Sequence, residues 1–210
     1  MNKSYKEEHN KKEQNEKEHN KKKEQEEDQN KEEQILYKKE GFIFSKVQNH
    51  HYKTTFSMEN KNIHLASVIN FDLIKLIYEL NYDVYEKVHL EKSSDSEAIA
   101  ILLIKHFFAD LGLPQKYSYL HIKKYIDENN VVFRCSSIHS EKPEGIPIDA
   151  ELMAINLMES VCALENPHKI NFTHNIYFDN GMYIPPFVEK MVGIIVNKIF
   201  KRVKQFIENL

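Results

Sequence analysis

Residues whose types could do chemistry are scattered in this sequence, and few share a spacing that a known site requires. His50 and His51 are adjacent and could bind a metal ion, but no matching carboxylate or thiol pattern accompanies them. Cys135 and Cys162 lack a Cys-x-x-Cys spacing, so we expect free thiols in a reducing compartment. The sequence contains no Ser-His-Asp order, Gly-rich phosphate loop or paired-carboxylate motif. It therefore predicts a protein that is not an enzyme and holds no metal or cofactor.

Composition limits the classes of partner. The 210 residues leave room for one or two domains, and a formal net charge of -3 gives no global basic field. The longest apolar runs are too short to span a bilayer, and no signal peptide opens the chain. We therefore expect a protein with no membrane partner.

Residues 1–34 differ in composition from the rest of the chain. They are almost entirely charged or amide residues, with Tyr5 as their only aromatic residue. Such a segment cannot bury enough apolar surface to offset the entropy lost on ordering. We therefore expect a disordered tail or a frayed charged helix over 1–34, and a near-neutral folded part over 35–210.

The centre of the folded part, residues 93–126, reads as a helix, a sharp stop and a strand. Ser and Asp residues at its start offer N-cap oxygens, and apolar residues follow at three- and four-residue spacing. Gly112 and Pro114 would end this helix, and alternation over 117–126 predicts a strand. The elements around this junction would position any site.

The remaining segments alternate between strand and helix patterns. Strand patterns cover 35–56, 81–91, 131–133 and 169–178, and helical spacing covers 63–80 and 187–210. Residues 149–166 fit either a helix or a strand, and 179–181 predict a hairpin turn after which 182–184 would pair back. Because each half ends in a strand and a long helix, we expect two repeats meeting near Pro114. Their helices, 94–112 and 187–210, would lie on the same face of one sheet.

Several short motifs, taken in order, resemble those of the TATA-box-binding protein family. Residues 111–117 are similar to the family's junction between repeats, Leu-Gly-Phe-Pro-x-Lys-Phe, and 140–147 to its Ser-x-x-Pro-Glu-x-x-Pro stirrup. The other similar segments are 47–49, 92–95 and 176–181. The resemblance implies an α+β fold in which two pseudo-symmetric repeats, 35–114 and 115–210, form a curved antiparallel saddle with long helices on one face.

The resemblance also implies site residues. Phe178 matches a side chain that wedges between base steps, and Ile146 stands where its partner Phe is expected. Asn49 matches an Asn that contacts base edges, and Lys124 replaces its counterpart in the second repeat. Glu144 matches the glutamate that transcription factor IIB contacts. Without the resemblance, Phe178 would be a packing residue and Asn49 a turn residue.

The implied function is that of a general transcription initiation factor. It would bind AT-rich double-stranded DNA in the minor groove and recruit proteins like transcription factors IIB and IIA and the RNA polymerase machinery. It would work in the nucleus or at a cytoplasmic transcription site. Two alternatives stay open: a scaffold of the same fold that binds protein, and an unrelated α+β enzyme or subunit.

Overall fold

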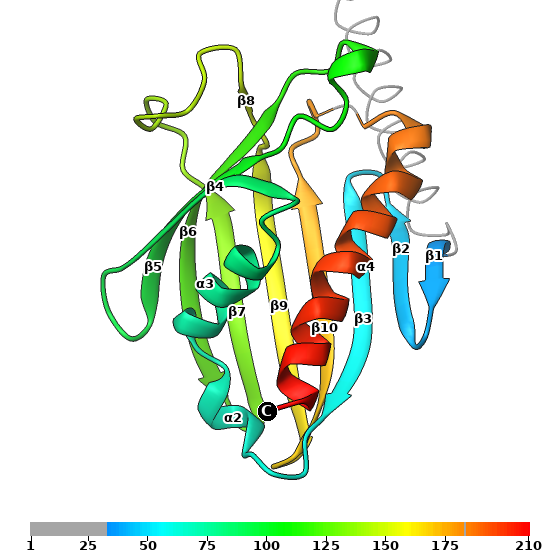
Figure 1. The fold of residues 1–210 in the computed structure, drawn as a ribbon, viewed down its shortest axis with the longest axis vertical. Helices are drawn as coiled ribbons and strands as arrows, with labels where there is room; N and C mark the ends of the chain where they lie inside the picture. The colour runs from blue at the N-terminus through cyan, green and yellow to red at the C-terminus, as the bar shows by residue number, and fades with distance from the viewer. Residues whose placement is uncertain (1–32, 183) are drawn as a thin grey trace, which may run out of the picture. The chain divides into compact units, whose positions relative to one another are not determined.

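One antiparallel sheet organises the part of the chain that the computed structural model describes, residues 33–182 and 184–210 (Figure 1). In chain order its strands are β1 (Gln34–Lys39), β2 (Phe42–Gln48), β3 (His51–Glu59), β4 (Tyr85–Lys92), β5 (Glu97–Ile104), β6 (Lys116–Asp127), β7 (Asn130–Ser137), β8 (Glu151–Leu152), β9 (Ile155–Asn166) and β10 (Lys169–Phe178). Across the sheet the order is β1-β2-β3-β10-β9-β7-β6-β5-β4, and the short β8 pairs in parallel with β6. The first three strands therefore lie beside the last one.

Two helices cover the same face of this sheet. The short α2 (Leu65–Val68) leads into α3 (Phe71–Leu80), and α4 (Pro186–Glu208) follows the last strand. α3 contacts β4 and α4, while α4 contacts β1, β2 and β3. Figure 1 shows α4, coloured orange to red, running along β10 and β3. A single 3-10 turn, η1 (Ala109–Leu111), lies in the connection between β5 and β6.

Local chemistry explains where the helices begin and how closely they pack. The Asn70 side chain caps α3 by accepting hydrogen bonds from the backbone amides of Asp72 and Leu73, at 2.9 and 3.0 Å. α4 begins at Pro186, where the missing amide hydrogen costs no helical hydrogen bond. A Cβ atom at Gly193 would lie 2.8 Å from Cδ1 of Phe44, so glycine lets α4 approach β2 closely.

The core lies between the sheet and the helices. Alternate strand residues point toward α3 and α4, as the two-residue period of a strand requires. In β3 these are Tyr52, Thr54, Phe56 and Met58, all buried. The larger apolar side chains of such a set each stabilise the fold by about 1.5–3 kcal/mol when removed from water.

The helix predicted over 94–112 is wrong. Residues 97–104 form β5, which pairs with β4 on one side and β6 on the other. The backbone amides of Ser93 and Ser94 donate to the Glu97 carbonyl at 3.0 and 3.1 Å, so the expected cap is a hairpin turn. Gly112 does adopt the left-handed conformation, with φ 69°, but it closes only η1. A continuous apolar run permits both helical and strand spacing, and strand pairing decides between them.

Most other expected elements are confirmed. The structure has strands within 35–56, 81–91, 117–126, 131–133 and 169–178, and helices within 63–80 and 187–210. The ambiguous segment 149–166 is mainly strand, as β9. Residues 179–181 do form a turn, but the chain then enters α4, and neither Met182 nor Ile184 is in a strand.

The predicted TATA-box-binding-protein saddle is wrong, because the elements do not repeat. The first of its two helices is a strand, and α4 has no counterpart in the first half. One continuous sheet joins β1–β3 to the C-terminal strand β10, so 35–114 and 115–210 are not two pseudo-symmetric halves. Residues 34–210 form one compact unit. In the predicted tail, 1–34, residues 1–32 lie outside the described residues.

Candidate functional site

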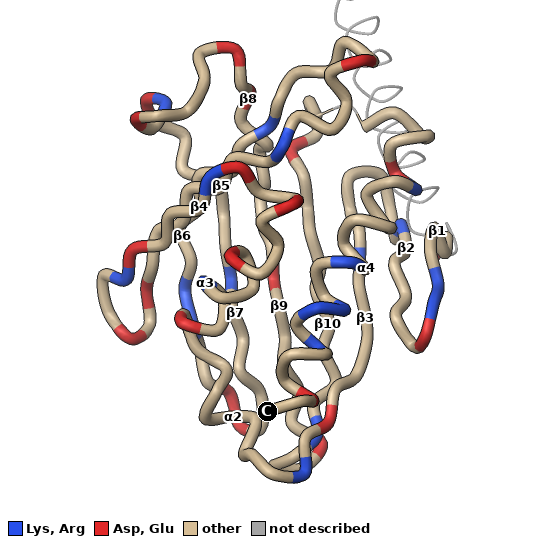
Figure 2. The backbone as a smooth tube through the Cα atoms, viewed as in Figure 1, with Lys and Arg blue, Asp and Glu red and all other residues tan. Residues whose placement is uncertain are grey.

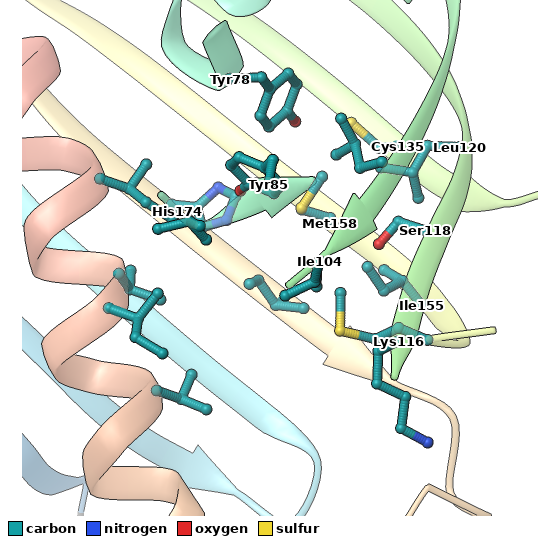
Figure 3. Close-up of a pocket in the computed structure, with 18 of the residues that line it drawn as sticks. Tyr78, Tyr85, Ile104, Lys116, Ser118, Leu120, Cys135, Ile155, Met158 and His174 are labelled. Atoms are coloured by element: carbon teal, nitrogen blue, oxygen red, sulfur yellow. The ribbon is translucent and has the colours of Figure 1, made fainter. Parts of the chain in front are cut away.

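A cavity of about 870 Å³ lies between the sheet and the helices α3 and α4. Inward-facing residues of β6, β7, β9 and β10 line one side, and one stripe of α4 lines the other. Figure 3 shows side chains from these elements directed into a common space. The volume falls within the range of about 300–1,000 Å³ that is typical of sites for small organic molecules.

Aliphatic and aromatic side chains make up most of the lining. Leu120, Ile155 and Met158 contribute from the strands, and Val188 and Val192 contribute from α4. Water gains little in such a space because it finds few hydrogen-bond partners. An apolar molecule would be removed from water there, which the hydrophobic effect favours. The cavity is therefore suited to an apolar ligand.

A few neutral polar side chains interrupt this lining. Those labelled in Figure 3 come from α3, β4, β6, β7 and β10: Tyr78, Tyr85, Ser118, Cys135 and His174. Asn70, Ser160 and Cys162 also line the cavity. His174 is held in place by Ser160, whose Oγ lies 2.7 Å from its Nδ1. Among the described residues, the hydroxyls of Tyr78, Tyr85 and Ser118 have no hydrogen-bond partner. Every fully buried side-chain nitrogen or oxygen of these residues does have a partner, so the three hydroxyls are not fully buried. They therefore open onto the cavity.

Burial keeps the titratable groups of the interior uncharged. It lowers the pKa of His174 from 6.5 to about 4 and raises the pKa of Cys135 from 9.0 to about 12. It also raises the pKa of Tyr78 and Tyr85 above the ordinary value of 10.0. In each case desolvation disfavours the charged form of the group. At neutral pH the imidazole, the thiol and both phenols are therefore neutral.

Charged lining residues come from segments at one end of the sheet, 105–116, 151–154, 179–182 and 184–185, which we call the loop end (Figure 1). They are Lys105, Lys116, Glu151 and Asp179. Nζ of Lys116 lies 2.6 Å from Oε2 of Glu151, and Figure 3 shows the Lys116 side chain extending away from the labelled interior residues. Because exposed side chains line the cavity here, it reaches solvent at the loop end.

Apolar side chains are exposed beside this opening. Phe107 and Leu111 in the loop end are 42% and 56% exposed. On α4, Phe187, Met191 and Ile194 are also exposed and share one face because they are spaced at helical intervals. Figure 2 shows charged residues of both signs interspersed along the described part of the chain.

Polar contacts fasten α4 to the sheet near both of its ends. In its first turn, the buried Glu189 carboxylate accepts hydrogen bonds from Lys46 Nζ at 2.7 Å and the Tyr52 hydroxyl at 2.6 Å. Near its last turn, Arg202 makes a two-point contact with the Asp83 carboxylate. That contact, with hydrogen bonding by Arg202 as the main cause, lowers the pKa of Asp83 far below its usual range.

The predicted DNA-binding residues do not gather into one surface. Phe178 is buried, lines the cavity and packs edge-to-face against Tyr52, with ring centroids 5.8 Å apart. Ile146 is buried in a second cluster, with Leu103, Tyr117 and Ala150. The predicted wedge pair would have to be exposed to enter DNA, so that interpretation is wrong.

The other predicted site residues lie elsewhere. Asn49 is exposed in the turn between β2 and β3, and Lys124 lies 5.9 Å from the centroid of the Phe71 ring. Glu144 is exposed in a loop, where its backbone carbonyl accepts a hydrogen bond from Lys87 Nζ at 2.9 Å. The DNA-contacting and factor-contacting roles given to these residues depended on the saddle.

Within residues 33–182 and 184–210, no group of three or more His, Cys, Asp or Glu side chains is placed to hold a metal ion. Across the same residues, no helix has both the length and the apolar character that a membrane-crossing helix needs.

Sequence reasoning did not identify the residues that line the cavity. Polar residues are uncommon at the inward, mostly apolar positions of strands. Three such positions in β6, β9 and β10 are occupied by Ser118, Ser160 and His174. That interruption is the one signal in the sequence that could have marked them. It became interpretable only once the strand pairing showed which residues face α4.

The fold and the cavity together define a class. A large, mostly antiparallel sheet packed against a long C-terminal helix, with an apolar cavity between them, is the helix-grip fold seen in solved StAR-related structures. A scan against protein-family models finds no match, and a search of curated proteins by sequence finds none. The fold is therefore established by structure alone.

Solved structures supply that comparison. Human STARD10 is similar with a TM-score of 0.63 and 12% identity, over 83% of this chain and 72% of that one. The lipid transfer and protein localization domain of human StarD13 gives a TM-score of 0.62 and 10% identity, over 90% and 95%. A STAR-related lipid transfer protein from Xanthomonas axonopodis gives 0.60 and 11%, over 83% and 98%. These likenesses overturn the TATA-box-binding-protein assignment.

Proposed function

We propose that this protein binds a lipid-like apolar molecule and carries it through water. The observation that carries the proposal is the cavity of about 870 Å³, mostly apolar and covered by α3 and α4. A volume of this size encloses a molecule with tens of carbon atoms, whose burial supplies a large hydrophobic driving force. That several proteins of the same fold are lipid-transfer proteins by name supports the same ligand class. A lipid-like ligand replaces the DNA and the transcription factors that we expected as partners from the sequence.

The loop end is the side from which we expect such a ligand to enter. A molecule insoluble in water must come from a membrane or from another carrier. The exposed Phe107 and Leu111 stand beside the opening and can enter the outer part of a lipid bilayer. Contact with a membrane at this end would let the ligand pass into the cavity without crossing water.

We also propose that the site binds its ligand without chemical change. The Ser160–His174 pair is the nearest approach to a catalytic arrangement, since a histidine can activate a serine. Among the described residues, no carboxylate contacts the His174 ring, and its low pKa makes the imidazole a weak base.

The nuclear localisation stays a prediction, which a fluorescent fusion would test.

Binding can be tested directly with the full chain. Nile red, an uncharged dye that fluoresces in apolar surroundings, should bind at one site and be displaced by lipids extracted from the expressing cells. Val192→Phe adds a ring on the lining side of α4 and should weaken dye binding at least about tenfold, because it fills the cavity.

The matched control lies two residues away on the same helix. Ile194 is exposed, so Ile194→Phe adds the same ring outside the cavity and should leave dye affinity unchanged. Equal loss in both variants would mean that the dye binds a surface, and absence of any dye or lipid binding by the folded protein would refute the proposed function.

A further inference from the structure

The interior of the cavity contains no charged partner for a ligand. Among the described lining residues, the carboxylates and ammonium groups all belong to the loop end: Lys105, Lys116, Glu151 and Asp179. Farther in, the polar groups are two phenols, two serine hydroxyls, two thiols, one amide and one imidazole. Each of these can exchange a hydrogen bond with a ligand, but none provides a counter-charge.

The absence of charged groups from the interior determines which polar groups of a ligand can be buried there. A phosphate or carboxylate buried without a cation would lose its hydration and gain no ion pair, which costs several kcal/mol. A hydroxyl or carbonyl loses far less, and the open hydroxyls of Tyr78, Tyr85 and Ser118 can replace its hydrogen bonds to water. Leaving those three groups unpaired beside an apolar ligand would be unfavourable for the same reason.

We propose that the ligand is an uncharged lipid with a hydroxyl or carbonyl group, bound with that group inside the cavity against Tyr78, Tyr85 and Ser118. The proposal rests on the proposed lipid-binding function and narrows its ligand class. It predicts that a lipid with an anionic head binds more weakly than an uncharged lipid of the same chain length. His174 adds a neutral hydrogen-bonding ring on the β10 side, fixed by Ser160.

A pair of ligands with the same chain and different head groups, one uncharged and one anionic, provides the test. Oleyl alcohol and oleate have the same chain, and at pH 8 oleate is almost entirely anionic. Each is delivered to the full-length protein from cyclodextrin, and its affinity is measured by displacement of Nile red. We expect oleyl alcohol to bind at least about tenfold more tightly than oleate, because only oleate must desolvate a charge.

Conservative variants locate the polar end of the ligand. Tyr78→Phe and Ser118→Ala each remove one hydroxyl and should weaken oleyl alcohol about two- to tenfold, the usual worth of one hydrogen bond. The affinity for 1-octadecene, a hydrocarbon of the same length, should stay the same or rise. Tyr82→Phe removes a phenol that is 73% exposed and outside the cavity, and it should change neither affinity.

The outcomes separate this inference from the proposed function. The inference is wrong if oleate binds as tightly as oleyl alcohol. It is also wrong if Tyr78→Phe and Ser118→Ala lose no more affinity for the alcohol than Tyr82→Phe does. In either case the proposed lipid binding still stands. If Nile red and all three ligands fail to bind the folded protein, the proposed function and this inference fail together. Unchanged Nile red affinity in the variants shows that the cavity is intact.

Discussion

Acid should destabilise this protein through one buried imidazole. His174 lies on β10 between the cavity and α4, stacked against Phe172 with ring centroids 6.0 Å apart and edge-on to Phe200 at 5.6 Å. Its Nδ1 hydrogen-bonds to the Ser160 hydroxyl, and no carboxylate contacts the ring among the described residues. Nothing near it therefore compensates a positive charge.

The sign and size of the effect follow from two pKa values. Burial lowers the pKa of His174 to about 4 in the folded state, against 6.5 in the unfolded chain. Between these values the unfolded state binds a proton that the folded state does not, so stability is present above pH 6.5 and falls as the pH drops toward 4. From pH 7 to pH 5 the loss is about 2 kcal/mol. In a protein of this size that lowers Tm by about 4–8 °C.

Thermal melts at pH 7 and pH 5 measure this loss. His174→Asn removes the titrating group and keeps an amide beside Ser160, so its Tm should fall by several degrees less over the same interval. His139→Asn changes an exposed histidine and should behave like the unsubstituted protein. If His174→Asn loses as much stability in acid as His139→Asn does, another group causes the loss and the reasoning from burial is refuted.

Three further predictions concern packing and exchange. Phe178→Ala should lower the free energy of unfolding by about 3–5 kcal/mol in denaturant titrations, because it removes a buried ring; a loss below about 1 kcal/mol would contradict the packing. Glu189→Gln should lower stability by about 1–3 kcal/mol and speed the release of bound Nile red, whereas the exposed Glu144→Gln should do neither. Replacing Phe107 and Leu111 with Ser should slow ligand transfer between vesicles while leaving equilibrium affinity unchanged, and a matched loss of affinity would count against a role in membrane contact.

Local sequence signals identified most elements but not how they assemble. The spacing in α4 and the alternation in β6 and β10 are unambiguous, because each of these elements presents one face to the core. Residues 97–104 were misassigned because an apolar run of Ala, Ile and Leu satisfies the helical period as well as the strand period. Only its pairing with β4 and β6 distinguishes the two.

That misassignment accounts for the wrong fold and function. Taking 94–112 as a helix made the two halves look alike, and the apparent repeat gave short motifs such as 140–147 a meaning that they lack here. Ile146 and Phe178 are apolar because they are buried, on separate clusters. The cavity itself could not be predicted, since a space between elements depends on the sheet order and on where α4 crosses it.

The two fastenings of α4 differ in a way that bears on ligand exchange. Near its end, Arg202 contacts Asp83 at two points, and the Ile207 carbonyl accepts a hydrogen bond of 2.6 Å from the buried Asn60 amide. At its start, the polar side-chain contacts of the described residues converge on the single carboxylate of Glu189. The cavity opens at this same loop end, so moving the first turns of α4 would break few polar contacts and widen the opening. The more firmly held C-terminal turns would keep the sheet and helix together while the ligand passes.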